Sequence, residues 1–469
     1  MRVPSRKHLS RSIRSAEGML AESPPRHEPG RAMSARLHLV AEQGREHLFD
    51  VESGRVSALP PALSSAIRAS LNAGDARRAE LIASGLGILS SPRPSFAPPK
   101  SAPTVAISLA IAQKCNLGCT YCYAQQGGFG SSPKDMPDSI ARAAVDRLLG
   151  GAKHGDRVTL GFMGGEPLSN RKALHAVTRY AAEEAAARGI AIGFTLTTNG
   201  TLLASEDIAL FQHYAFTLTV SADGHGATHD ALRPFAGGRG SFAQVARNVR
   251  RLVATEGRRF RVLARVTVTP ENLDLPATLR SLLAMGFDSV MFAPLLNAPS
   301  GKQQMKGGDF AQLLEQLGQC ADMFRSEAAK GRILPLANVI TTLQRIHHYR
   351  REHYPCGAGG GYVAASADGG LFACHRFVDD EGGYLGDVLD GISPERQARW
   401  LHERNLQSQS PCPSCWARYL CSGSCHYEVL KEGRPACDYI RGWVDRCLAL
   451  YVRLARDQRA VLDQVLAFE

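Results

Sequence analysis

The sequence predicts an α/β protein whose main domain is built on a parallel sheet. Three observations point to this fold. Six apolar strand patterns alternate with helical patterns from residue 104 onward, a shorter run of strands precedes them, and glycine and cysteine replace the alternation after about residue 350. Six consecutive strand–helix units form either a doubly wound sheet or an incomplete (βα)6 barrel. The 469 residues suffice for two or three domains.

The first 34 residues predict a disordered basic tail, because they hold seven basic and three acidic residues and show no apolar period. The whole chain has a net charge of +11, which is compatible with an acidic peptide or a nucleic acid as partner. The longest clean apolar stretch, 105–112, is too short to span a membrane. We therefore expect a soluble, cytoplasmic protein with no membrane partner.

Residues 35–90 predict a small winged α+β segment. Strands are expected at 38–41, 47–51 and 56–59, and helices at 62–71 and 76–84. The segment is either a cap on the main domain or a docking module that holds a peptide by strand addition to an exposed edge. Residues 91–103, which are rich in proline, form the expected linker.

Residues 104–335 hold the predicted parallel sheet. Its strands are expected at 105–112, 158–163, 190–197, 216–221, 260–269 and 289–295. Its helices are expected at 139–150, 170–188, 205–213, 241–256, 275–285 and 309–330. Ligands of such sheets bind at the carboxyl ends of the strands, so we expect the functional site there.

The twelve cysteines are distributed unevenly. None occurs before residue 115, three follow the first strand of the sheet, one stands alone at position 320, and eight lie between residues 356 and 447. Clustered cysteines in a cytosolic chain favour metal or iron–sulfur sites over a disulfide scaffold. Cys320 falls in a predicted helix and is expected to be a buried, small apolar residue.

The first cysteine group has the spacing Cys115-x3-Cys119-x2-Cys122. Three thiolates hold three irons of a [4Fe–4S] cluster and leave the fourth iron open, whereas zinc needs a fourth ligand and none occurs before His154. With Tyr121 before the last cysteine, the segment resembles the radical S-adenosylmethionine (SAM) enzymes. The resemblance implies a partial barrel, SAM on the open iron, and a 5′-deoxyadenosyl radical that takes a hydrogen atom from the substrate.

The resemblance extends to residues that would contact SAM. Tyr121 would lie against the adenine, the alternative being a packed aromatic ring at a strand end. Two glycines let a backbone approach a ligand, and a carboxylate accepts hydrogen bonds from an ammonium group; the residues after the second strand match the family motif for the SAM amino group. By resemblance, residues near the fourth strand are candidates for the SAM carboxylate, the alternatives being a cap or a surface ion pair. The first set is Gly164, Gly165 and Glu166, and the second is Ser221 and Arg233.

The eight later cysteines make two sites of four, for which zinc ribbons are the structural alternative. The series resembles the SPASM domain of peptide-modifying radical SAM enzymes, which implies two auxiliary [4Fe–4S] clusters within residues 350–455. The resemblance assigns Cys356, Cys374 and Cys425 to a nearer cluster, and Cys412, Cys415, Cys421 and Cys437 to an outer one. Cys447 either completes the nearer cluster or is buried in an apolar helical stretch. In the second case the nearer cluster has an open iron for a substrate thiolate.

The resemblance implies a ribosomally made peptide or small protein subunit as substrate and a reductant such as flavodoxin or ferredoxin. In sulfatase maturases, which form formylglycine, an aspartate directly after the cysteine that matches Cys374 serves as base. Here that position is His375, which is either a catalytic base or a neutral neighbour of a cluster thiolate.

The runs that contain Tyr123, Cys356 and Cys374, together with the winged segment, look most like thioether-forming maturases. These act on six-cysteine peptides and on a subunit of quinohemoprotein amine dehydrogenase. We therefore expect intramolecular thioether formation, with His375 as the candidate catalytic residue. A non-catalytic iron–sulfur sensor or scaffold is the alternative of a different class. Nucleic acid is not the expected substrate, because no aromatic–basic array is present.

Overall fold

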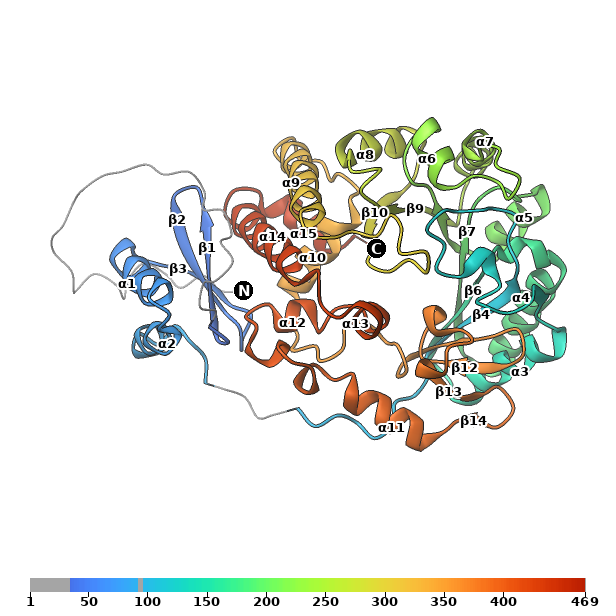
Figure 1. Cartoon of the computed structure of the whole chain (residues 1–469), viewed down its shortest axis with the longest axis horizontal. Coiled ribbons are helices and arrows are strands. Elements are labelled where there is room, and N and C mark those ends of the chain that lie inside the picture. Colours follow the sequence, from blue (N-terminus) through green and yellow to red (C-terminus); the bar gives the residue numbers. More distant parts are fainter. Residues whose placement is uncertain (1–33, 92–95, 469) are drawn as a thin grey trace.

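The computed structural model describes residues 34–91 and 96–468, and Figure 1 shows their arrangement. The basic tail predicted for residues 1–34 lies outside the described residues except for Ser34, as does part of the predicted linker. An N-terminal unit lies at one end of the molecule and a parallel barrel at the other, with the cysteine-rich C-terminal segment between them (Figure 1). No helix among the described residues is long and apolar enough to cross a bilayer.

The barrel confirms the predicted fold class. Six parallel strands pair in chain order, and each is followed by at least one helix on the outside. The strands are β4 (Ala106–Gln113), β6 (Arg157–Gly164), β7 (Ala191–Thr198), β8 (Thr217–Ser221), β9 (Arg261–Val268) and β10 (Ser289–Pro294). The helices are α3 (Asp138–Gly150), α4 (Arg171–Ala187), α5 (Ser205–Tyr214), α6 (Gly226–Leu232), α7 (Phe242–Val253), α8 (Leu275–Ala284) and α9 (Asp309–Ala328).

Alternating burial of the side chains shows which face of these strands packs against the helices. Leu218 and Val220 on β8 are completely buried, whereas Ser221 is partly exposed. On β9, which pairs with a strand on each side, Val266 is buried, whereas the side chain of Arg265 is exposed. Because successive side chains of a strand point to opposite faces, one face of the sheet packs under the helices and the other faces the open inside of the barrel.

The C-terminal segment extends the barrel sheet. β11 (Tyr362–Ala365) pairs in parallel with β4, and β12 (Gly370–Phe372), β13 (Tyr384–Asp387) and β14 (Gly391–Ile392) follow as an antiparallel ladder. The short β5 (Lys134–Asp135) pairs with the other end of β4. The cysteines of this segment are therefore attached to the first barrel strand, which precedes the Cys115 loop.

Helices make up most of the remaining C-terminal segment. They are α10 (Ala337–His347), α11 (Pro394–Glu403), α12 (Arg418–Cys421), α13 (His426–Glu432), α14 (Cys437–Asp457) and α15 (Arg459–Leu466). The apolar helical stretch predicted around Cys447, residues 443–454, covers only the inner part of α14, whose first turn begins at Cys437 and includes Asp438. Trp400, Trp416 and Trp443 belong to the same continuous core as the barrel residues, so the segment has an apolar core in addition to its cysteines.

The N-terminal unit has the predicted winged form. Its antiparallel strands are β1 (Leu37–Glu42), β2 (Arg45–Asp50) and β3 (Val56–Ala58), and its helices are α1 (Pro61–Asn72) and α2 (Ala76–Gly85). Leu48 packs in a small core with the two helices. Its neighbour Phe49 belongs to the main core of the molecule. One face of this sheet therefore packs on its own helices and the other on the C-terminal segment.

Candidate active site

The first cysteine group lies in the loop after β4, at the carboxyl end of the barrel. Cys115, Cys119 and Cys122 act on one another electrostatically, so their thiols are close together. Burial raises the pKa of the Cys119 thiol to about 12, and the positive charge of Arg233 opposes this rise. Binding of iron deprotonates such thiols. Three clustered thiols beside a guanidinium therefore fit an iron–sulfur cluster with an anionic ligand set.

Asn199 is a functional candidate that the sequence reasoning missed. It follows β7, and its Nδ2 donates to Cys115 Sγ at 3.7 Å and to Asn116 Oδ1 at 2.9 Å. Asn116 in turn donates to Thr201 Oγ1 at 2.8 Å. The signal in the sequence is Thr198-Asn199-Gly200 at the end of a strand, a tripeptide that by itself indicates no link to the cysteines. Asn199 joins the third strand end to the first cysteine of the triad.

Gly164 and Gly165 are required by the protein's own backbone. A methyl group on Gly164, whose φ is +148°, would overlap the carbonyl oxygen of Ala112. A methyl group on Gly165 would overlap Lys114 and the Cα atom of Gly127. The sequence predicts that these glycines make room for a ligand. The structure shows that they also let the segment around the cysteine triad cross the end of β6.

Glu166 is completely buried and anchors the next strand end. Its carboxylate accepts hydrogen bonds from Thr198 Oγ1 at 2.8 Å, from Asn199 N at 2.7 Å and from Leu168 N at 3.1 Å. Burial raises the pKa of Glu166 to about 6, and these hydrogen bonds oppose the rise. Glu166 therefore positions Asn199 beside Cys115, whereas its contact with the SAM amino group stays a prediction.

Tyr121 and Arg233 form a buried polar cluster beside the triad. Arg233 Nη1 donates to the Tyr121 hydroxyl at 2.5 Å and lies 3.5 Å from Asp223 Oδ2, and the Tyr121 hydroxyl donates to Asp223. The Nε atom of Arg233 is buried without a hydrogen-bond partner. Ser221 stands on the inner face of β8, opposite Arg265 of β9. Arg233 has an unused donor for an anionic ligand, which fits the predicted SAM carboxylate.

Residues 109–317 match the family model described as the Radical SAM superfamily. These residues form a radical SAM domain, and the chain is an enzyme. Its cofactors are a [4Fe–4S] cluster and SAM, because enzymes of this family use both. The three thiols after β4, with their neighbouring Arg233, are the residues that fit this pair of cofactors.

Several relatives are sulfatase-maturating enzymes. The serine-type anaerobic sulfatase-maturating enzyme of Klebsiella aerogenes is 24% identical over 351 residues, which cover 71% of this chain and 83% of the relative. That of Bacteroides thetaiotaomicron is 23% identical, over 73% of this chain and 88% of the relative. Among solved structures, anSMEcpe with bound AdoMet aligns with a TM-score of 0.64 and 20% identity, over 78% of this chain and 98% of that one. This structural match supports the fold.

The C-terminal cysteines fall into two groups, and the thiols of each group interact electrostatically with one another. Cys374 is acted on by Cys356 and Cys425, and burial raises the pKa of Cys374 to about 12. The second group, in which burial raises the pKa of Cys421 to about 11, comprises Cys412, Cys415, Cys421 and Cys437. Among the described residues, no three His, Cys, Asp or Glu side chains are placed so that they could hold one metal ion. The two groups coincide with the nearer and outer clusters that the resemblance implies.

Cys447 belongs to neither group. It is 1% exposed on α14, and burial raises the pKa of its thiol far above the usual value. This thiol interacts with the side chains of Thr342, Asp445 and Arg446 and not with the cysteines of the nearer group. Cys320 is likewise buried in the main core, on α9, where burial raises its pKa to about 12. The nearer group therefore contains three cysteines in this structure.

Aromatic and basic residues lie between the first cysteine group and the nearer C-terminal group. The hydroxyl group of Tyr123 interacts electrostatically with the thiols of both Cys122 and Cys374. The Arg376 guanidinium lies 5.1 Å from the Tyr123 ring centre and forms an ion pair with Glu428. Arg376 is also near Cys425. This pair connects the surroundings of the two cysteine groups across the mouth of the barrel.

His375, the predicted catalytic residue, lies in the same region. Its Nδ1 is 3.1 Å from the Tyr362 hydroxyl. Burial lowers the pKa of His375 to about 3, and the positive charges of Arg376 and Arg265 add to this effect. The imidazole is therefore neutral at pH 7 and, with so low a pKa, a weak proton acceptor. Its role as a base stays a prediction.

Proposed function

We propose that this enzyme oxidises a side chain of a peptide or small protein. The observation that carries the proposal is the nearer C-terminal cysteine group, which Tyr123 and Arg376 connect to the surroundings of the SAM-binding triad. When bound, the SAM-ligated cluster supplies a radical that takes one hydrogen atom from the substrate, and an auxiliary cluster accepts the electron that remains. The substrate thus loses two electrons and two protons in total.

The relatives support a peptide substrate and favour an aldehyde product. Sulfatase-maturating enzymes cover most of this chain, and anSMEcpe has been solved with a bound peptide. By this similarity we propose that a serine is oxidised to formylglycine, or that a cysteine is oxidised to a thioaldehyde, which water then converts to formylglycine with release of hydrogen sulfide. His375 then holds the place of the proton acceptor, since the aspartate of the sulfatase maturases is absent from this position.

Thioether formation is the second candidate, and the position of Cys447 is the observation that favours it. With Cys447 beside Thr342 and not beside Cys374, three cysteines remain for the nearer cluster. A cluster held by three thiolates has one iron free to bind another thiolate. A peptide cysteine bound there would form its sulfur–carbon bond with the radical carbon, losing a proton from the thiol and an electron to the cluster.

The charge of the barrel mouth supports an acidic peptide. Arg265 projects from the inner face of β9 into the open barrel, where the surrounding protein lowers its pKa and the positive charge of Arg376 adds to this effect. Arg265 forms no ion pair with a carboxylate in the described part of the chain, whereas Arg376 pairs with Glu428. We propose that an acidic side chain of the peptide pairs with Arg265.

The test is an anaerobic assay of the reconstituted enzyme with SAM, dithionite and the peptide that was solved with anSMEcpe. Serine and cysteine forms of the peptide, each with and without a neighbouring acidic residue, are incubated separately. Formation of 5′-deoxyadenosine and a product that reacts with a hydrazide supports formylglycine. A product that has lost two hydrogen atoms, resists thiol alkylation and does not react with the hydrazide supports the thioether. A reconstituted enzyme that makes no 5′-deoxyadenosine contradicts both.

A further inference from the structure

The N-terminal unit covers the segment that carries Cys415 of the outer cysteine group. Trp416, the next residue, is 4% exposed. The ring of His38 on β1 stacks on Trp416, with ring centres 3.6 Å apart and planes within 3°. Phe49 on β2 meets the same indole edge-on at 6.5 Å. Two neighbouring strands of the N-terminal unit therefore bury the residue that follows a predicted cluster ligand.

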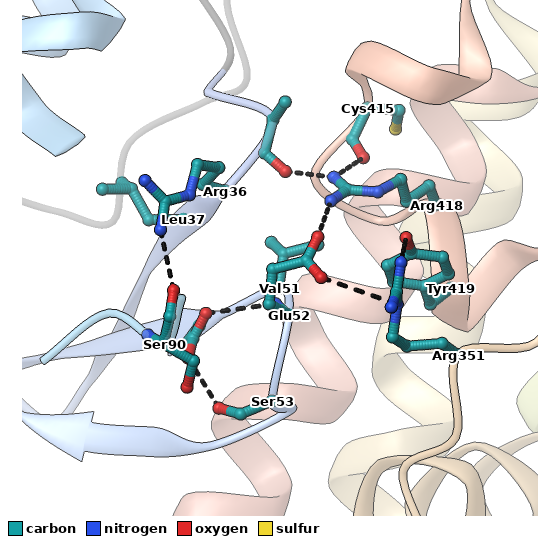
Figure 2. A network of polar contacts seen from close by, with 12 residues as sticks. Arg36, Leu37, Val51, Glu52, Ser53, Ser90, Arg351, Cys415, Arg418 and Tyr419 are labelled. Atoms are coloured by element: carbon teal, nitrogen blue, oxygen red, sulfur yellow. Dashed lines mark hydrogen bonds and ion pairs between the residues drawn. The ribbon is translucent and has the colours of Figure 1, made fainter. Parts of the chain in front are cut away.

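A charged contact connects the same two parts, as Figure 2 shows. Arg418 donates from Nη2 to Glu52 Oε1 at 2.7 Å and from Nη1 to the carbonyl oxygen of Cys415 at 3.2 Å. Its Nη1 also donates to the carbonyl oxygen of Ala35, just before β1. Arg418 thus fastens the backbone of Cys415 to two points of the N-terminal unit.

The surroundings hold Glu52 in place. It is 6% exposed, and its Oε2 lies 3.5 Å from Nε of Arg351. Its backbone N–H donates to Asp50 Oδ1 at 3.1 Å, within the turn between β2 and β3 (Figure 2). A carboxylate buried between two guanidiniums has little freedom to move, because breaking either pair leaves a buried charge unpaired.

We propose that the N-terminal unit forms one wall of the outer auxiliary-cluster site, with Glu52 and Arg418 as positioning residues for the Cys415 loop. The proposal rests on the proposed function, in which Cys412, Cys415, Cys421 and Cys437 hold that cluster. Glu52 acts on Cys415 through Arg418. Docking of the N-terminal unit and binding of the outer cluster then stabilise each other, since each favours the same arrangement of this loop.

The experiment compares Glu52→Gln with the wild type in the full-length, reconstituted enzyme. Glu46→Gln is the matched control, because Glu46 pairs with Arg68 inside the same N-terminal unit. Iron content, the rate of iron loss to a chelator, and the reduction potential of each cluster by electron paramagnetic resonance are measured. Three clusters correspond to about twelve irons per chain.

We expect Glu52→Gln to lose about four irons to the chelator at least tenfold faster than the wild type, a typical effect of removing a group that orients a metal ligand. The potential of the outer cluster should rise, because loss of a nearby negative charge stabilises its reduced form. Arg418→Lys keeps the charge but lacks the forked donors, so it should also speed iron loss. Glu46→Gln should match the wild type.

Three results overturn the proposal in different ways. If Glu52→Gln and Arg418→Lys release iron at the wild-type rate and keep the wild-type potential, the N-terminal unit does not position Cys415. If the wild type itself holds only the irons of the SAM cluster, the proposed auxiliary clusters are wrong, and this inference falls with them. A Glu52→Gln chain that loses iron from all three sites together also contradicts it, because that is general unfolding.

Discussion

Replacement of Gly164 by alanine tests whether the end of β6 supports the cysteine triad. The new methyl group would overlap the carbonyl oxygen of Ala112 on β4, and the residue would keep a φ of +148° that only glycine adopts easily. Strained backbone costs about 1–3 kcal/mol, and overpacking costs about 1–3 kcal/mol more. We therefore expect the free energy of unfolding to fall by about 2–6 kcal/mol.

The matched control is Gly193→Ala on the neighbouring strand β7. There the added methyl carbon would lie 3.9 Å from the Val158 carbonyl oxygen, an ordinary contact, so stability should change by about 1 kcal/mol or less. The midpoints of thermal unfolding of the two variants should differ by about 1–6 °C, because unfolding a chain of 469 residues has an entropy of roughly 1 kcal/mol per kelvin. Iron content after reconstitution reports on the triad, because Ala112 precedes Cys115 by three residues. If the two variants unfold together and hold equal iron, the steric argument is refuted.

Three further predictions concern Asn199 and Glu166 beside the first cysteine group and Cys447 on α14. Asn199→Ala removes the hydrogen bond to Cys115 and should lower the reduction potential of the SAM cluster, measured by electron paramagnetic resonance during a redox titration; an unchanged potential would contradict the contact. Because the pKa of Glu166 is raised from 4.5 to about 6 in the folded state, its contribution to stability should be largest below pH 4.5 and be lost as the pH rises through about 6. The free energy of unfolding of the apoprotein, measured with denaturant, should change by about 2 kcal/mol over this pH range. The same change should be absent from the apoprotein that carries Glu166→Gln. Cys447→Ala should leave the iron content unchanged, and a loss of iron on metal analysis would identify Cys447 as a ligand.

The location of the aromatic and basic residues gives the proposed chemistry a physical basis. Tyr123 follows the last cysteine of the triad, and Arg376 follows Cys374 by two residues. Short loops therefore attach each residue directly to a cysteine group, and the stacking of Arg376 on Tyr123 brings these loops together. An electron that leaves a substrate radical in this region has a predicted cluster close by.

Local sequence patterns determined the architecture to a large extent. The six barrel strands and all the barrel helices except α6, which was not predicted, lie within a few residues of the predicted ranges, because alternation and helical periodicity act over short stretches of chain. The spacing of Cys115, Cys119 and Cys122 likewise predicted a cluster site from a short stretch of chain, since all three cysteines lie in one loop. The helix α10 was not predicted, as its short apolar face lies between two segments with other patterns.

Only the tertiary structure decided which distant residues meet. Asn199 reaches Cys115 across 84 positions of the chain, and Arg418 reaches Glu52 across 366. Cys447 has the sequence context of a ligand, yet the packing of α14 places its thiol beside Thr342. Such contacts depend on how strands and helices pack, which no short pattern encodes. The sequence thus determined the radical SAM barrel and its cysteine triad, and the packing decided what supports the triad and what covers the outer cysteine group.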